Sequence, residues 1–232
     1  MFDGKLKAVT FSYDDGVLQD ERLIQIFRKY NLKCTFNINS ELLGVEAQLT
    51  IRDKQINHTK IQPEDVKKMY EGHEVAVHTL THPRLPMLDA DEIIRQVEQD
   101  RMNLSRLVDY EVKGMAYPCG GVNNDDRVAA IIKANTGVKY ARTITSSGQF
   151  DLQENLYRFN PTVYHLKFDE LFQYGEKFID LKTDTPQLYY IWGHSYEFDI
   201  DHTWEKFDEF CKMISNRDDI FYGTNSEVFG IE

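Results

Sequence analysis

Two short segments, far apart in the chain, carry the residues best suited to chemistry. The first ends an apolar run with adjacent carboxylates, Asp14 and Asp15. The second carries two imidazoles four residues apart, His78 and His82. One carboxylate and two imidazoles are typical ligands of a catalytic metal, and a spare carboxylate beside them suits a general base. The pattern predicts a metal-activated water with a base next to it.

The histidine pair also has an ordinary interpretation as surface or capping residues. Its placement favours the metal, because His78 follows the apolar run Val75–Val77 and Pro83 prevents a strand from continuing. The remaining histidines lack such a context and are interpreted as surface or structural residues: His58, His73, His165 and His202.

The two aspartates could instead cap the following helix, with Gly16 in the turn, and Asp15 alone could fill that role. A cap leaves the second carboxylate unexplained, and burying it unpaired beside an apolar strand would cost several kcal/mol. A metal removes that cost for one aspartate. The other can then serve as a base.

Short apolar runs alternate with amphipathic segments, which is typical of repeated strand–helix units. We expect strands at residues 6–13, 34–38, 74–77, 112–117, 138–142, 188–192 and 220–224. We expect helices at 18–30, from 63 onward, and at 89–108, 125–135, 168–182 and 203–215, with a long irregular excursion at 40–62. About seven or eight parallel strands in one domain, residues 1–232, predict an α/β barrel.

Polar residues fall where the predicted strands end. They are Asp14 and Asp15, His78, Pro118, Arg142 and His194. The carboxyl ends of parallel barrel strands share one face, and that face carries the active site. These residues are therefore expected to converge in one cleft.

Bulk properties narrow the range of partners. The formal net charge is -11, which disfavours nucleic acid and anionic membranes as partners. The three cysteines are widely spaced, so we expect reduced thiols rather than a disulfide framework. No apolar stretch is long enough to span a membrane and no signal peptide is visible, so we expect a cytoplasmic protein.

Four segments resemble, in order, the motifs of the polysaccharide deacetylases (carbohydrate esterase family 4). Residues 10–16 resemble the first motif, T-F-D-D-G, and residues 78–83 match the second, H-[ST]-x-x-H-P. Residues 116–120 resemble the third, R-x-P-Y-G, and residues 191–194 resemble a last motif in which an apolar run ends in His. The ordered set covers most of the chain.

The resemblance implies a deformed (β/α) barrel and a divalent metal, usually zinc, with cobalt or nickel as alternatives. It implies the following roles: metal ligands Asp15, His78 and His82, base Asp14, acid His194, and an oxyanion donor in the backbone N–H of Cys119.

The chain departs from the family pattern at three points. Ala116 stands where the third motif has the Arg that positions the base, and we hypothesise that Arg142 supplies a guanidinium from the next strand. Cys119 replaces the usual Tyr, but the expected oxyanion donor is a backbone N–H, which does not depend on the side chain. The aspartate that orients the acid His has no clear counterpart, and Asp151 or a residue of the segment 195–197 could serve instead.

Three functions follow from these patterns. The first is a metal-dependent hydrolase that removes an N-acyl group, most simply acetyl, from an amino sugar. The second keeps the mechanism but acts on a small non-sugar amide or ureide. The third is a catalytically weak barrel that binds a carbohydrate or a partner. The sequence does not fix the oligomeric state.

Overall fold

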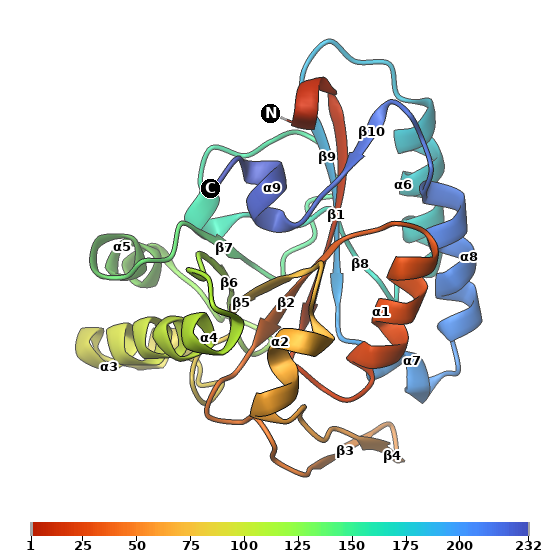
Figure 1. The fold of residues 1–232 in the computed structure, drawn as a ribbon. Helices are drawn as coiled ribbons and strands as arrows, with labels where there is room; N and C mark the ends of the chain where they lie inside the picture. The colour runs from red at the N-terminus through yellow and green to blue at the C-terminus, as the bar shows by residue number, and fades with distance from the viewer. Residues whose placement is uncertain (1, 232) are drawn as a thin grey trace.

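The apolar runs of the chain form one parallel sheet in the computed structural model, which describes residues 2–231 (Figure 1). The sheet has eight strands, and every pairing within it is parallel. Across the sheet the strands are β7 (Tyr140–Arg142), β6 (Gly114–Ala116), β5 (Glu74–Val77), β2 (Cys34–Ile38), β1 (Lys7–Asp14), β9 (Gln187–Gly193) and β8 (Val163–Tyr164), with β10 (Ile220–Tyr222) pairing with the start of β1.

The sheet curls into a partial barrel. β7 and β8 are its outermost strands, and an isolated parallel bridge between Arg142 and Phe159 links the end of β7 to the segment before β8. The central strand β1 is buried along its whole length. The predicted class, a deformed (β/α) barrel of parallel strands in one domain, is confirmed.

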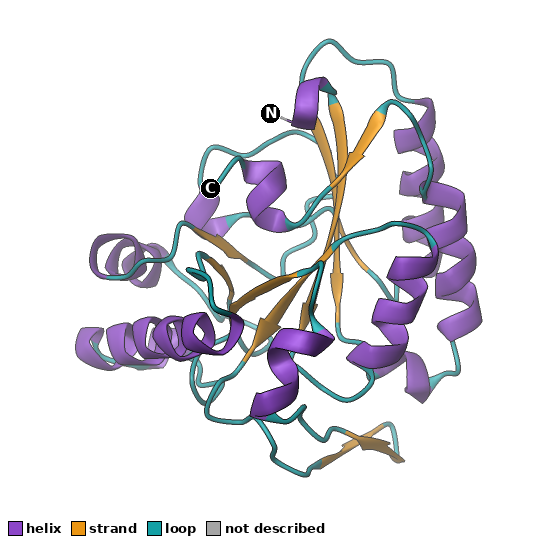
Figure 2. Cartoon of the chain, viewed as in Figure 1, coloured by secondary structure: helices purple, strands orange, loops and turns teal. Residues whose placement is uncertain are grey.

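Most helices cover the outside of the sheet (Figure 2). The helices are α1 (Asp20–Lys29), α2 (Val66–Met69), α3 (Ala90–Ile94), α4 (Asp100–Val108), α5 (Asp126–Asn135), α6 (Phe168–Asp180), α7 (Glu197–Ile200), α8 (Trp204–Ile214) and α9 (Asn225–Phe229). α9 lies on the inner face, because its Asn225 bonds to Thr10 of β1, whereas the neighbouring Phe11 packs on α1. α1 shows the logic: Leu23 and Phe27 are buried on one face, while acidic residues begin the helix and basic residues end it. Phe27 packs on Phe11 of β1, so apolar burial fixes helix to sheet.

Most predicted elements are present with shifts of a few residues at their ends, but the excursion 40–62 was wrongly expected to be irregular. It contains an antiparallel hairpin, β3 (Gln48–Ile51) and β4 (Lys54–Asn57). The turn residues Arg52 and Asp53 both have positive φ angles, 50° and 63°. A tight hairpin turn needs that conformation, but Asn-Gly or Asp-Gly is its usual sequence signal, and Arg-Asp gives none.

Two further differences concern helices. The segment expected as one helix from 89 to 108 is helical throughout, but a π-helical turn (Arg95–Gln99) separates α3 from α4. The helix expected from Pro63 begins as a 3-10 turn, Pro63–Asp65, before α2. The two-residue strand β8 was not expected, because so short a strand leaves no periodic pattern.

The carboxyl ends of five strands carry the polar residues singled out above, as predicted. β1 ends at Asp14, and β7 ends at Arg142. β5, β6 and β9 end shortly before His78, Pro118 and His194, respectively. The β3–β4 hairpin and α7 lie at this same end, at the bottom of the view in Figure 1. Within residues 2–231, no helix is long and apolar enough to cross a membrane.

Candidate active site

Asp15, His78 and His82 form a group whose ligand atoms lie within 4.8 Å of one another. Oδ1 of Asp15 is 3.8 Å from Nε2 of His78 and 3.6 Å from Nε2 of His82. Atoms that share a tetrahedral zinc ion at about 2.0–2.2 Å lie about 3.4 Å apart. The separations and the donor set therefore fit a divalent metal, with three protein ligands and room for a fourth.

Strained backbone conformations gather around this group. Asp15, Thr79, His82 and Cys119 all have positive φ angles, 87°, 69°, 60° and 69°. Such angles cost about 1–3 kcal/mol each for residues other than glycine, and they cluster at functional sites. Gly16 continues the turn with φ 62°, and a Cβ there would lie 2.8 Å from Cγ2 of Ile38, so only glycine fits.

Contacts to the far side of each ring orient the two imidazoles. Nδ1 of His78 lies 2.9 Å from the carbonyl oxygen of Ala116, which leaves Nε2 facing Asp15. Nδ1 of His82 lies 3.7 Å from Sγ of Cys119. Burial lowers the pKa of His78 to about 4 and also lowers the pKa of His82, so both rings are neutral near pH 7. Neutral imidazole is the form that binds metals.

The π-helical turn supports the loop that carries both histidines. The backbone carbonyl of Gln96 accepts a hydrogen bond from the N–H of Leu80 at 3.0 Å, and Oε1 of Gln96 accepts one from the N–H of Thr81 at 3.1 Å. The buried carboxyl of Asp100 accepts from the backbone N–H of His78 at 3.2 Å. The turn thus presents both a backbone carbonyl and a side-chain oxygen of Gln96 to the loop.

Asp15 is held from the opposite side by the segment that follows β4. Nε2 of His58 lies 3.2 Å from Oδ2 of Asp15, and Nζ of Lys60 donates to the backbone carbonyl of Asp15 at 2.8 Å. Burial opposes the charge on Asp15, but the hydrogen bond with His58 and the charge of Lys60 hold its pKa well below the usual range. His58, interpreted from the sequence as a surface or structural residue, is mostly buried, and its ring contacts this carboxylate.

The capping alternative for the aspartates is also wrong. The residue that precedes α1 is Gln19, and its side chain makes no capping hydrogen bond. Asp15 instead faces the two histidines, and Asp14 faces the interior of the barrel, where it is buried.

Asp14 is paired with Arg142, which reaches it from β7. Nη2 of Arg142 lies 2.5 Å from Oδ1 of Asp14 and also contacts Oδ2. Asn37 donates to the same Oδ1 at 2.8 Å, and the guanidinium stacks on the Trp192 ring at 4.6 Å. The Arg142 side chain is 0% exposed, so it is not a surface residue at a strand end. A guanidinium thus meets Asp14 from the strand beside β6, which carries Ala116.

His194 faces the same carboxylate from β9. Its Nε2 lies 4.0 Å from Oδ2 of Asp14, and its Nδ1 lies 3.0 Å from Oε2 of Glu197. Burial opposes a charge on His194, but the carboxylates of Glu197, Asp15 and Asp14 raise its pKa to about 9. The ring therefore carries a proton near pH 7. Asp151, the other orienting candidate, lies at the opposite end of β9 beside Gln187.

Glu197, which belongs to the segment 195–197 named above as a candidate, is the centre of a hydrogen-bonded network whose other members the sequence did not reveal. Nε2 of His165 lies 2.8 Å from Oε2 of Glu197, and the Tyr164 hydroxyl donates to Oε1. Nδ1 of His165 lies 3.1 Å from the Tyr13 hydroxyl. Of the two interpretations of His165, surface or structural residue, its complete burial excludes the first. Its signal was its place directly after β8, a strand too short to be recognised.

Gly193 makes this arrangement possible. A Cβ at position 193 would lie 2.2 Å from Cδ2 of His165. The absence of a side chain lets the imidazole pass against β9 and reach Glu197. The glycine before His194 is thus a packing requirement of the site.

The sequence pattern of the family described as polysaccharide deacetylase matches residues 3–141. The chain belongs to the polysaccharide deacetylase family. Peptidoglycan-N-acetylmuramic acid deacetylase PdaC from Bacillus subtilis is 25% identical over 128 residues, which are 54% of this chain and 24% of that protein. The chain thus spans about a quarter of the length of this curated relative.

Solved structures agree on the fold. A family 4 acetyl xylan esterase from Clostridium thermocellum, in complex with a cobalt ion, has a TM-score of 0.61 at 14% identity, with 97% of this chain and 91% of that chain covered. A polysaccharide deacetylase from Bacillus cereus has a TM-score of 0.51 at 19% identity, with 64% of this chain and 44% of that chain covered. At these identities the likeness concerns the fold.

The loop after β6 brings Cys119 beside His82. Sγ of Cys119 lies 3.4 Å from the carbonyl oxygen of His82, and burial raises the pKa of its thiol. A thiol that keeps its proton is a poor nucleophile. All three cysteines are free, and Cys34 and Cys211 are buried.

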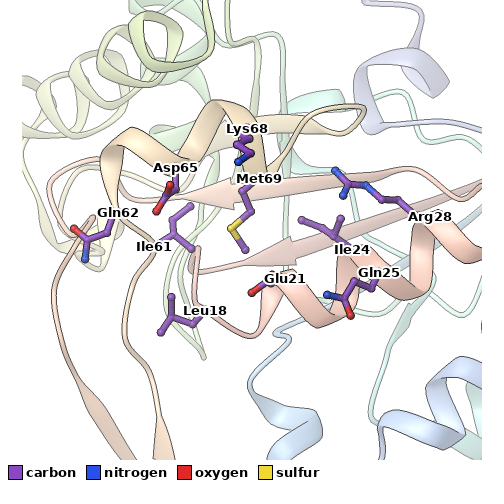
Figure 3. A pocket seen from close by; sticks show the side chains of 10 residues that line it. All are labelled: Leu18, Glu21, Ile24, Gln25, Arg28, Ile61, Gln62, Asp65, Lys68 and Met69. Carbon is purple, nitrogen blue, oxygen red and sulfur yellow. The ribbon is translucent and has the colours of Figure 1, made fainter.

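A groove of about 390 Å³ lies away from this centre, between α1 and the segment that leads into α2 (Figure 3). Ile24 and Met69 line its apolar part, and Glu21, Arg28 and Asp65 are among the polar residues around it. None of the candidate catalytic or ligand residues lines it. It is a surface feature separate from the site.

Proposed function

We propose that this polysaccharide deacetylase removes an N-acyl group, most simply acetyl, from an N-acetylated amino sugar. The proposal rests on one observation above all. A three-residue group with metal-ligand geometry is flanked by a carboxylate paired with Arg142 and by an imidazole that carries a proton. Hydrolysis of an amide needs both a base for water and an acid for the leaving amine.

Asp15, His78 and His82 are the residues that would hold the ion. Zinc is the first candidate, with cobalt and nickel as alternatives, because a site of two imidazoles and a carboxylate accepts several metals. A bound ion would lower the pKa of a water to about 7 and polarise the acyl carbonyl.

The protein's own residues do the remaining work. Asp14, fixed by Arg142, accepts the proton of the attacking water. The backbone N–H of Cys119, beside His82, donates to the developing negative charge on the acyl oxygen. His194, oriented and charged by Glu197, donates its proton to the leaving nitrogen.

The decisive experiment measures acetate release from N-acetylglucosamine oligomers by zinc-loaded or cobalt-loaded protein. Asp14→Asn should keep metal affinity and lower turnover about 10²- to 10⁴-fold, since a positioned base contributes about that much. Asp184→Asn, which changes an exposed aspartate, is the matched control and should retain activity. Full turnover by Asp14→Asn would refute the assignment of the base. If Asp14→Asn instead lost its affinity for the metal, the two aspartates would have exchanged roles.

The same assay separates the other functions. Turnover of small amides or ureides without acetate release from sugars would favour the non-sugar hydrolase. Metal binding without turnover of either class would favour a binding barrel. The cytoplasmic location stays a prediction, and so does the exclusion of nucleic acid and membranes as partners.

A further inference from the structure

The segment that follows β4 is hydrogen-bonded to the loop that carries Asp15. It runs antiparallel to the residues that follow Asp15, through a bridge between Val17 and Lys60 and a hydrogen bond of 3.0 Å from the N–H of Ile61 to the carbonyl of Gly16. On its other edge, the N–H of His58 donates to the carbonyl of Ala47 at 2.9 Å. Backbone bonds on both edges fix the position of His58.

The hairpin is also anchored to α7, which follows His194. Nζ of Lys54 donates to the carbonyl of Ile200 at 2.6 Å. Ile56 packs in a small apolar cluster with Val17, Tyr196 and Ile200. The excursion therefore contacts both the metal-binding side and the acid side of the site.

The His58 ring is held at its edge and at its tip. It meets the Tyr196 ring edge-on, with centroids 4.9 Å apart and planes at 85°. Its side chain is 13% exposed. Nε2 points at Oδ2 of Asp15 at 3.2 Å, while Oδ1 of Asp15 is the atom that faces His78 and His82.

We propose that His58 is a positioning residue of the metal site, which donates a hydrogen bond from Nε2 to Oδ2 of Asp15 and leaves Oδ1 as the ligating oxygen. The inference rests on the proposed function, because it presumes that Asp15 binds a metal. Partners that hold a ligand's second atom fix its orientation, and their loss typically weakens metal affinity about 10- to 100-fold.

The geometry favours positioning over direct ligation by His58. The group whose ligand atoms all lie within 4.8 Å of one another consists of Asp15, His78 and His82 and does not include His58. His58 already lies at hydrogen-bonding distance from the oxygen that faces away from the two imidazoles. A carboxylate with one oxygen toward the ion and one toward a donor is a common arrangement around bound metals.

The test is cobalt and zinc affinity, measured by competition with a chelating dye on metal-free protein. His58→Ala should bind both metals about 10- to 100-fold more weakly. His58→Gln carries an amide donor at similar reach and should recover most of that loss. His202→Ala, at an exposed histidine, is the matched control and should bind as the wild type does. Thermal unfolding of the metal-free variants identifies any that fail to fold. If His58→Ala is one of them, the metal affinity of His58→Gln tests the inference in its place.

The cobalt absorption spectrum provides a second readout. If His58 only positions Asp15, the ligand set is unchanged, and the spectrum of metal-saturated His58→Ala keeps the wild-type band pattern. A changed coordination spectrum, or affinity of a folded His58→Ala within threefold of the wild type, would overturn the inference. Failure of the wild-type protein to bind either metal would overturn the proposed function itself, which is a different result from equal binding by wild type and variant.

Discussion

The Asp14–Arg142 pair makes the sharpest prediction about stability. Both side chains are almost fully buried, at 2% and 0% exposure. The guanidinium bonds directly to both oxygens of Asp14, whereas Nε2 of His194 lies 4.0 Å from Oδ2. Arg142→Met keeps the apolar stem of the side chain but removes the charge. The carboxylate would then keep Asn37 as a neutral donor but lose the cation that is bonded to it.

Removing one partner of a buried ion pair costs about 3–5 kcal/mol, because the remaining charge is left uncompensated. For a chain of this size, 1 kcal/mol corresponds to about 2–4 °C in melting temperature. Arg142→Met should therefore melt roughly 6–20 °C below the wild type. The lost stacking on Trp192 adds to the same direction.

Thermal unfolding of metal-free protein, followed by circular dichroism, measures this loss. Arg22→Met is the matched control, because Arg22 pairs with Glu205 at 52% and 78% exposure, and such a surface pair is worth about 0–1 kcal/mol. The double variant Asp14→Asn/Arg142→Met removes both charges and should recover about 1–3 kcal/mol relative to the sum of the single changes. If Arg142→Met had the same melting temperature as Arg22→Met, Arg142 would not be the counter-charge that the buried Asp14 requires.

Two further predictions concern the acid side of the site. Glu197→Gln removes the carboxylate bonded to His194, whose pKa stands at about 9, so the basic limb of the kcat/KM profile should move down toward the ordinary value of 6.5. The proposed mechanism needs the protonated ring, so activity should be lost as pH rises through that pKa. Glu205→Gln, at an exposed glutamate, is the control. If the basic limb of Glu197→Gln lay at the same pH as that of the control, this role for Glu197 would be contradicted. Gly193→Ala would put a Cβ 2.2 Å from the His165 ring and should cost about 1–3 kcal/mol or more in thermal unfolding. Gly120→Ala, where a Cβ meets nothing within 4 Å, should stay within about 0.5 kcal/mol, and equal stability of the two variants would refute the packing argument.

The barrel could be predicted from the sequence because its strands are short buried runs separated by amphipathic helices. Strands 34–38 and 74–77 are present with the predicted bounds. The residues predicted to follow the strands all lie at the carboxyl edge of the sheet. The hairpin at 48–57 could not be predicted in this way. Its strands are mostly exposed, and its turn uses residues that carry no hairpin signal.

The candidate site divides along the same line. The two histidines and the adjacent carboxylates could be proposed from spacing, since the aspartates and His78 stand at the ends of apolar strands and His82 lies four residues after His78. The resemblance to the family then selected Asp15 as the ligand. His58 and His165 could not, because their roles depend on contacts across the sheet and between chain segments far apart in sequence. His58 meets Asp15 through the hairpin, and His165 meets Glu197 only because Gly193 leaves space between them.

Two of the three departures from the family motifs concern charge, and in both a residue from elsewhere in the sequence lies close enough in space to supply that charge. A buried carboxylate needs a cation, but the cation need not come from one particular strand. Arg142 approaches Asp14 from β7, one strand beyond Ala116, and supplies the cation that this buried carboxylate needs. His194 needs an anion at Nδ1, and Glu197 supplies it from the next helical turn, with His165 and Tyr164 satisfying its oxygens. Asp14 and His194, the proposed base and acid, therefore each have a partner of opposite charge, although neither partner stands in the expected motif.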